Sequence, residues 1–502
     1  MITLNGKSLT LKELWKISMH NEGVRISQHS YSDVRKSREE LEKILSSGSS
    51  FYGVNTGFGS LWNKRIDDAD LLQLQEHLIM SHSAGVGAPL DAGIVRAMLA
   101  IRVNSLIKGY SGVSEDLIST VVSMLNKNII PFVPSIGSVG ASGDLAPLAH
   151  IALAVMGKGE VLQGGERMPS IKAFQKSGIK PHMFLEKEGV AFINGTTAIT
   201  SILALQAYRC MNLINIAVAS SLLFFEAMKG NESAFTDWAV ESRRQKGQKD
   251  VAAAFRALLS DRPEEEKNNP RNLQDPYTIR CIPQVYGAVL DTIRYCTDIA
   301  ENEMNSVTDN PLIHNMKIIS AGNFHGEPVA FASDFLGIAM TDFGNMLERQ
   351  IARMIDSNLS GLPPFLTNDS GLNSGYMIPQ YVAAALCNMN KVLSHPASSD
   401  SIPTSANQED HVSMGMNSAL KLINIVDNLE SIIAIHTLLS AQAFDLSHVK
   451  GTSFARHLRD KIRKRVPFLD ADRPPYLDLE KVRNTLMSDT EKIISRMPLP
   501  LD

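Results

Sequence analysis

Long segments with few interior glycine or proline residues constrain the fold of this chain most strongly. They cover residues 96–108, 148–156, 198–228, 284–300, 335–355 and 416–443. Glycine and proline destabilise helix interiors, so runs of this length favour helices over strands. The sequence therefore predicts a mostly α protein with a core of long helices.

The overall charge and the amino terminus exclude several classes of protein. Of 502 residues, 44% are hydrophobic and 20% are charged, and the formal net charge is −4. This balance indicates neither nucleic-acid affinity nor an acidic solvated tail. Residues 1–7 lack the apolar region of a signal peptide, so we expect a cytoplasmic protein.

Cysteine spacing and one apolar stretch bear on cofactors and membranes. The four cysteines lie far apart and form no Cys-x-x-Cys pair, so neither a disulfide framework nor a zinc site is expected. Residues 211–228 are apolar enough to suggest a membrane span, but polar residues such as Asn215 and Glu226 interrupt them. We expect a buried helix there and no membrane partner.

The chain shows no linker that would separate domains. Its length alone suggests roughly three domains, but the sequence favours a single unit over 1–502. Within it we expect an amino-terminal region over about 1–110 and a helical core with the carboxyl-terminal region over about 111–502. The charged stretch near 232–272 predicts a solvated excursion, partly helical.

Residues 137–144 contain an Ala-Ser-Gly tripeptide among residues small enough for a tight backbone fold. If the Gly143 nitrogen lies against the Ala141 carbonyl carbon, a five-membered ring can close, and loss of water there and from Ser142 leaves an exocyclic methylidene. This group is a carbon electrophile, and glycine permits the approach because it has no Cβ. The alternatives are a plain turn and a phosphate-binding loop. Residues 144–148 predict the start of a helix.

Other polar and aromatic residues in loops are candidates for a site. Tyr52 lies in a glycine-rich loop, and His82 ends a helix-like run. Tyr277 and Arg280 are three residues apart, close to one helical turn, and an arginine fork suits a carboxylate. Residues 407–411 are densely polar. Taken singly, these residues fit purely structural roles better than a site: a packed aromatic, a satisfied or surface histidine, a solvated or ion-paired arginine and a capped helix start.

The motifs taken together resemble the aromatic amino-acid ammonia-lyases and aminomutases, which build a methylidene-imidazolone group from Ala-Ser-Gly. The resemblance runs essentially from end to end of the chain. It is carried by residues 52–59, 137–150, 193–196, 274–280, 308–311, 322–325, 360–365, 371–377, 407–414 and 467–470.

The resemblance implies a mostly α fold, with a core bundle of long parallel helices and a smaller amino-terminal region. It also implies a homotetramer in which each active site gathers residues from three chains. The cofactor expected is 4-methylidene-imidazol-5-one formed from the chain itself, with no external cofactor and no metal. The implied partner is a small-molecule amino-acid substrate.

Five residues receive the chemical roles of the family. Ala141, Ser142 and Gly143 form the electrophile that captures the substrate amine. Tyr52 is the implied base for the β-proton, a task that requires its surroundings to lower the pKa of the phenol. Arg280 is expected to hold the substrate carboxylate.

The remaining site residues orient the substrate and the ring. Tyr277, Asn194 and Gln274 are expected to position both. Phe324 is expected to pack near the ring, and Glu409 to lie near the amine or side chain of the substrate.

Two segments resemble the histidine-specific members of the family. They are Ser81-His82 and residues 408–411, since a carboxylate and an imidazole suit a polar substrate ring better than a phenyl group. The expected reaction is elimination of ammonia from L-histidine to give trans-urocanate. The chain departs from the histidine-specific pattern at Thr197 and at residues 245–248.

Two other functions stay open on the sequence alone. One is a sister activity, either a tyrosine or phenylalanine ammonia-lyase or an aromatic amino-acid 2,3-aminomutase with the same prosthetic group. The other is a binding or structural protein that keeps the fold without catalysis, which the presence of Tyr52, Arg280 and the intact tripeptide disfavours.

Overall fold

The computed structural model describes residues 1–46, 51, 53–57, 64–497 and 499, and these are predominantly helical, as predicted. The chain divides into two compact units. Unit 1 comprises Met1–Tyr208, Cys296–Asp334 and Pro396–Leu420, and unit 2 comprises Arg209–Tyr295, Phe335–His395 and Lys421–Asp502. Each unit is assembled from separate stretches of sequence. The organisation of 1–502 as one functional unit stays a prediction.

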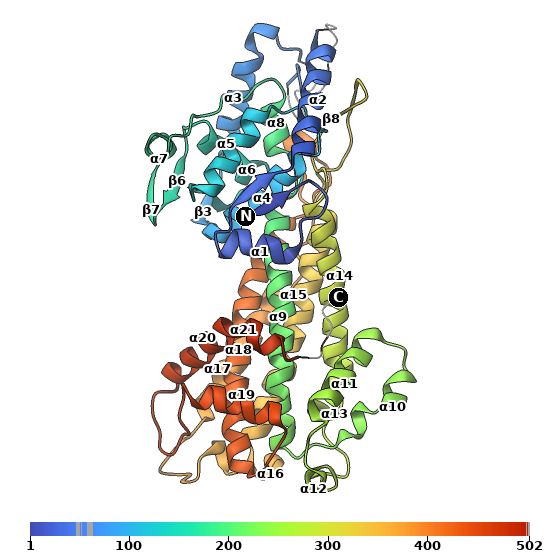
Figure 1. Ribbon diagram of the computed structural model, residues 1–502, viewed down its shortest axis with the longest axis vertical. Coiled ribbons are helices and arrows are strands. Elements are labelled where there is room, and N and C mark those ends of the chain that lie inside the picture. Colours follow the sequence, from blue (N-terminus) through green and yellow to red (C-terminus); the bar gives the residue numbers. More distant parts are fainter. Residues whose placement is uncertain (47–50, 52, 58–63, 498, 500–502) are drawn as a thin grey trace. The chain divides into compact units, whose positions relative to one another are not determined.

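The long helices confirm the sequence-based ranges, with ends that agree to within eight residues; the largest difference is at the start of α15. In Figure 1 they are α9 (Thr197–Ala227), α14 (Ile282–Met304), α15 (Glu327–Ile355) and α18 (Gly415–Ser447). Helices α9 and α18 are long and apolar enough to cross a membrane. However, 89% of the most apolar 18-residue stretch of α9 and 72% of that of α18 are buried inside the protein. They are therefore core helices, as expected for residues 211–228.

Besides parts of the long helices, unit 1 contains shorter helices and all the described strands. The shorter helices are α1 (Leu11–Met19), α2 (Gln28–Leu45), η2 (Asp68–Asp70), α3 (Leu71–His82), α4 (Ala92–Leu106), α5 (Glu115–Asn126), α6 (Leu145–Val155), α7 (Ser170–Ser177), α8 (Glu188–Ile193) and η5 (Ser405–Asn407). Its strands are β1 (Ile2–Leu4), β2 (Val24–Ile26), β3 (Val86–Pro89), β4 (Ile130–Pro131), β5 (Pro134–Ile136), β6 (Glu160–Gln163), β7 (Glu166–Pro169), β8 (Leu312–His314) and β9 (Lys317–Ile319).

Small sheets fix the turns between the helices of unit 1. Strands β1 and β2 pair in parallel, whereas β3–β5, β4–β6–β7 and β8–β9 are antiparallel. In the β3–β5 pair Val86 lies opposite Ile136. This pairing brings the end of α3, which carries His82, beside the start of the 137–144 loop.

The regular elements among the described residues of unit 2 are all helices, joined by turns and loops. Besides parts of the long helices it contains η3 (Glu232–Phe235), α10 (Asp237–Glu241), α11 (Lys246–Leu259), α12 (Glu264–Lys267), α13 (Tyr277–Arg280), α16 (Ser357–Ser360), η4 (Pro364–Leu366), α17 (Met377–Leu393), α19 (Ser453–Arg463), α20 (Pro475–Ser488) and α21 (Thr490–Ile494).

Buried polar side chains join the long helices inside unit 2. Ser220 on α9 shares a 2.6 Å hydrogen bond with Nδ1 of His436 on α18, and burial lowers the pKa of His436 to about 3. Ser221 bonds the hydroxyl of Tyr286 on α14 at 2.6 Å. Tyr286 in turn packs edge-on against Phe343 of α15, with ring centroids 4.7 Å apart. These contacts build the predicted helical core.

The polar excursion near 232–272 is partly helical, as expected. One face of α11 is nevertheless buried, because Phe255 stacks on Phe235 with ring centroids 4.7 Å apart and both rings contact Phe225. The charged composition of the segment gave no indication of this aromatic cluster. The segment is therefore anchored to α9 within unit 2 rather than only solvated.

Candidate active site

The Ala-Ser-Gly loop of unit 1 runs from the end of β5 to the start of α6. Gly143 adopts the left-handed region, with φ of +73°, and pairs with Gly195. The amide nitrogen of Asp144 donates to the carbonyl oxygen of Gly195 at 2.7 Å. A Cβ at position 143 would collide with the Gly195 backbone. Glycine is therefore required at 143 by conformation and by space.

We expect Gly143→Ala to lower the thermal midpoint of the full chain far more than Gly164→Ala does. Gly164 also has a left-handed φ, +61°, but nothing lies within 4 Å of an added Cβ. The control carries only the conformational cost, about 1–2 kcal/mol, whereas position 143 adds the collision, about 1–3 kcal/mol more. Equal midpoints for the two variants in a thermal melt would refute the close packing of this loop.

Asp144 joins the loop to the core of unit 1. Its carboxylate accepts from Ser138 Oγ at 2.8 Å and from the amide nitrogens of Ala198 and Ile199 at 2.8 and 3.0 Å. Burial raises the pKa of Asp144 to about 6, although these hydrogen bonds oppose the shift. The predicted helix start at 144–148 is confirmed, since α6 begins at Leu145. The carboxylate, however, caps α9 rather than α6.

Ser142 is held at its hydroxyl by Glu409. The Ser142 Oγ donates to Glu409 Oε1 at 2.7 Å, and Thr404 Oγ1 donates to Glu409 Oε2 at 2.6 Å. Backbone hydrogen bonds also pair Thr404 with Glu409. Both carboxylate oxygens are thus oriented by hydroxyl groups. The sequence did not indicate Thr404 as a member of the site, because threonine in a loop has no distinctive signal.

Asn194 holds the carbonyl oxygen of Ser142. It follows α8, and its Nδ2 donates to that oxygen at 2.9 Å. The side chain is buried, and its Oδ1 has no hydrogen-bond partner among the described residues. Ser142 is therefore contacted at its hydroxyl by a carboxylate and at its carbonyl by an amide donor.

His82 lies at the end of α3 and is half-buried. Its Nδ1 donates to the carbonyl oxygen of Leu78 at 2.8 Å, which leaves Nε2 as an acceptor in the neutral ring. Burial lowers the pKa of His82, while the bond to Leu78 and the charge of Glu409 oppose the shift. A neutral His82 with an accepting Nε2 suits an N–H donor such as an imidazole.

Phe324 lies on the segment that packs against the Ala-Ser-Gly loop. A Cβ on nearby Gly326 would come within 3.0 Å of Ser413 Oγ and 3.8 Å of the Gly140 carbonyl oxygen. Phe324 itself is half-buried. Unit 1 therefore brings Ala141, Ser142, Gly143, Asn194 and Glu409 together, with the segments of His82 and Phe324 beside them. Tyr52 lies outside the described residues.

Gln274, Tyr277 and Arg280 form a second group within unit 2. With its amide oxygen turned toward the guanidinium, Gln274 accepts from both terminal nitrogens of Arg280 at 2.6 and 2.7 Å. The guanidinium carbon lies 4.7 Å from the centroid of the Tyr277 ring, a cation–π contact. These residues line a cavity of about 500 Å³ that also contains Arg271 and Arg353. The cavity suits an anionic group.

The residues present fit a prosthetic group made from Ala141, Ser142 and Gly143. Gly143 packs so closely against the Gly195 backbone that there is no room for a Cβ. The buried Oδ1 of Asn194 has no hydrogen-bond partner among the described residues. Ring closure between Gly143 and Ala141 would retain the Ser142 carbonyl, which already has a donor in Asn194. It would also use the Ser142 hydroxyl, which already has an acceptor in Glu409.

Comparisons with known proteins agree on one family. The family model described as aromatic amino acid lyase matches residues 9–464. The chain is 53% identical over 493 residues to a probable histidine ammonia-lyase of Thermoplasma volcanium, covering 98% of this chain and 99% of that protein. The crystal structure of histidine ammonia-lyase from Trypanosoma cruzi is similar with a TM-score of 0.93 and 37% identity, covering 99% and 96% of the two chains.

An aminomutase has a similar structure. The crystal structure of tyrosine aminomutase from Streptomyces globisporus matches with a TM-score of 0.93 and 35% identity, covering 99% of this chain and 98% of that one. The fold is therefore shared by enzymes whose names indicate two different outcomes.

Proposed function

Because the chain belongs to the aromatic amino acid lyase family, we propose that it eliminates ammonia from L-histidine and releases trans-urocanate. The observation that carries this proposal is the environment of Ser142. Glu409 accepts from its hydroxyl and Asn194 donates to its carbonyl oxygen. These two atoms matter for an electrophile made from Ala-Ser-Gly, because its formation removes the Ser142 hydroxyl and its ring keeps the Ser142 carbonyl oxygen.

The prosthetic group, 4-methylidene-imidazol-5-one, would supply a carbon electrophile for the substrate amine, with no external cofactor. Asn194 donates to the Ser142 oxygen that the ring retains, where negative charge would develop. A preorganised donor at such an oxygen is worth roughly 10²–10³ in rate. Glu409, fixed by Thr404, keeps a carboxylate oxygen directed at Ser142.

Arg280 would bind the substrate carboxylate. Gln274 and the Tyr277 ring orient the guanidinium before substrate arrives, so little side-chain freedom is lost on binding. The buried Nε of Arg280 has no hydrogen-bond partner among the described residues and is available to a carboxylate oxygen. Tyr52 is proposed as the base for the β-proton, and Phe324 as a packing residue beside the ring.

His82 is proposed to choose histidine over tyrosine and phenylalanine. Its accepting Nε2 pairs with the imidazole N–H of histidine but is left unpaired by a phenyl ring. Glu409 is proposed as a second polar partner for the imidazole of the substrate, since its carboxylate is close enough to His82 to affect the pKa of that histidine.

We expect His82→Leu to lower kcat/KM for histidine and to raise any activity on phenylalanine or tyrosine relative to it. Leucine removes the acceptor and makes an apolar wall. The matched control is His77→Leu, the same change at an exposed position of the same helix. Assays of both variants with the three amino acids check this. An unchanged preference in His82→Leu would move selection to Glu409.

The enzyme is proposed to act as a cytoplasmic homotetramer with shared active sites. Within unit 2, α14 and α15 expose apolar side chains, and Tyr295, Phe335 and Ile338 line a groove of about 840 Å³. A second copy of the chain would cover this surface. Neither nucleic acid nor a membrane is proposed as a partner.

The experiment that tests the proposed reaction is product identification. Purified full-length protein is incubated separately with L-histidine, L-tyrosine and L-phenylalanine, and the organic products and ammonia are quantified. We expect trans-urocanate and ammonia in equal amounts from histidine. Formation of a β-amino acid without release of ammonia would instead establish an aminomutase. A dominant product from tyrosine or phenylalanine would overturn the choice of histidine.

A further inference from the structure

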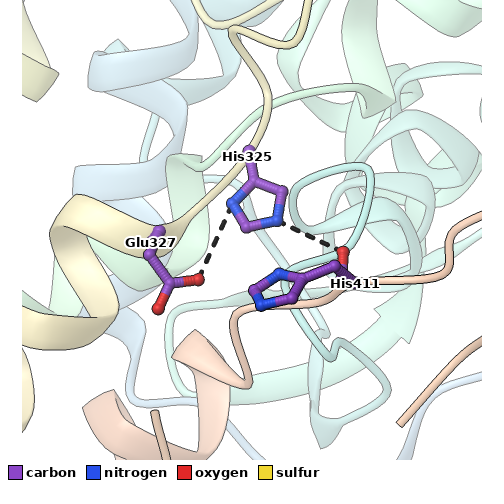
Figure 2. Close-up of side chains that lie close together, drawn as sticks. All are labelled: His325, Glu327 and His411. Atoms are coloured by element: carbon purple, nitrogen blue, oxygen red, sulfur yellow. Dashed lines mark hydrogen bonds and ion pairs between the residues drawn. The ribbon is translucent and has the colours of Figure 1, made fainter. Parts of the chain in front are cut away.

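Three side chains of unit 1 converge beside the Ala-Ser-Gly loop, and the proposed reaction assigns no chemical step to any of them. They are His325, Glu327 and His411, whose ligand atoms all lie within 4.8 Å of one another. Figure 2 shows the His325 ring with one nitrogen directed at Glu327 and the other at the His411 backbone. Sequence spacing does not reveal this cluster, because His325 and His411 are 86 residues apart.

One hydrogen bond of the cluster matches the contact that a metal-bound histidine makes with its second ring nitrogen. His325 Nε2 lies 3.3 Å from the carbonyl oxygen of His411, so Nε2 carries the proton and Nδ1 presents a lone pair. A histidine that binds metal typically donates its other ring N–H to a carbonyl or carboxylate in this way. The backbone contact therefore selects the tautomer that a cation at Nδ1 requires.

Glu327 faces that lone pair but is too distant for a hydrogen bond. Its Oε2 lies 3.9 Å from His325 Nδ1. The atom is buried, and among the described residues it accepts no hydrogen bond; its ion-pair contact with His325 is the long one just given. A buried carboxylate oxygen without a hydrogen bond is costly, and a cation between it and His325 would satisfy both atoms.

We propose that His325, Glu327 and His411 bind a divalent transition-metal ion of the zinc class. Two imidazoles and a carboxylate are a ligand set that zinc takes with a fourth position left for water. Bonds of about 2.1 Å place tetrahedral ligand atoms about 3.4 Å apart. The 3.9 Å separation is near this value, and the exposed His411 ring is able to rotate to complete the set.

The ion would tie two segments of the candidate site together. Glu327 is the first residue of α15 and follows the Phe324 segment, while His411 lies two residues after Glu409. Bound metal therefore holds the Glu409 loop against the start of α15. This is a structural consequence, and the binding itself does not depend on the proposed reaction.

Cobalt(II) binding to the full-length protein tests the proposal without an activity assay. The protein is treated with a chelator, dialysed and titrated with Co²⁺ alone while visible absorption and bound metal are measured. We expect one ion per chain, with the absorption of four- or five-coordinate cobalt. Zn²⁺ should displace it. Because binding joins two segments, Zn²⁺ should also raise the thermal midpoint.

Single-ligand variants locate the ion. Glu327→Gln and His411→Gln should each weaken Co²⁺ binding by more than about 100-fold. Loss of a residue that only supports a ligand already costs up to about 100-fold in metal affinity, and loss of a direct ligand should cost more. His411 is exposed, so its replacement leaves the fold intact even where that of Glu327 does not. His395→Gln, at an exposed histidine outside the cluster, should bind as the parent does. No binding by the parent, or equal binding by His411→Gln, would overturn the proposal.

Discussion

Replacing Ser142 by alanine is expected to lower turnover of L-histidine by at least about 10³-fold, or about 4 kcal/mol of transition-state stabilisation. Alanine has no hydroxyl to lose, so the methylidene cannot form. The contact with Glu409 Oε1 disappears with it. The backbone contact from Asn194 to the carbonyl oxygen of residue 142 is independent of the side chain and should survive. The helical signal in circular dichroism should therefore be unchanged.

The matched control for this variant is Ser135→Ala. Ser135 is a half-buried serine of β5, on the same stretch of chain, but it lies outside the tripeptide. It should retain near-parental turnover. Turnover by Ser142→Ala within tenfold of the parent would show that the serine is not the source of the electrophile.

Arg280→Lys is expected to lower kcat/KM by about 10²-fold, although the positive charge is kept. Lysine is a point charge and cannot present the planar fork that a carboxylate meets. It also cannot be held at two nitrogens by the Gln274 oxygen, nor stack on Tyr277 as the guanidinium does. The loss should fall mainly on carboxylate recognition.

A comparison of L-histidine with its amide isolates that recognition. The parent enzyme should strongly prefer the acid, and the preference should shrink in Arg280→Lys because the fork is gone. Arg256→Lys, an arginine on α11 of the same unit, serves as the control. If the parent uses the amide as well as the acid, Arg280 does not bind the carboxylate.

The long helices could be predicted from the sequence because their signal is local. The interior of α9 contains neither glycine nor proline, so propensity and length agree with the final structure. The cluster of Phe225, Phe235 and Phe255 could not be predicted in this way. Its members are separated by polar residues, and only the packing of α11 against α9 brings the rings together.

The requirement for glycine at 143 was also predictable, since a tight turn among small residues is a local property. The partner that enforces it, Gly195, is not local. The same holds for Glu409, which accepts a hydrogen bond from the hydroxyl of Ser142, 267 residues away along the chain. Spacing along the chain carries no information on such contacts, and the resemblance identified these residues without their mutual geometry. Asp144 illustrates the point, because its carboxylate caps a helix that starts far along the chain.

The account depends on the conversion of Ala141-Ser142-Gly143 into an electrophile, and the mass of the purified parent chain tests this most directly. Ring closure and dehydration of the serine each release one water. Intact-mass spectrometry should therefore find the chain two waters lighter than its sequence requires. Peptide mapping should place the loss between residues 141 and 143, and Ser142→Ala should lack the water that comes from the serine. Active parent protein with the full unmodified mass would contradict the account.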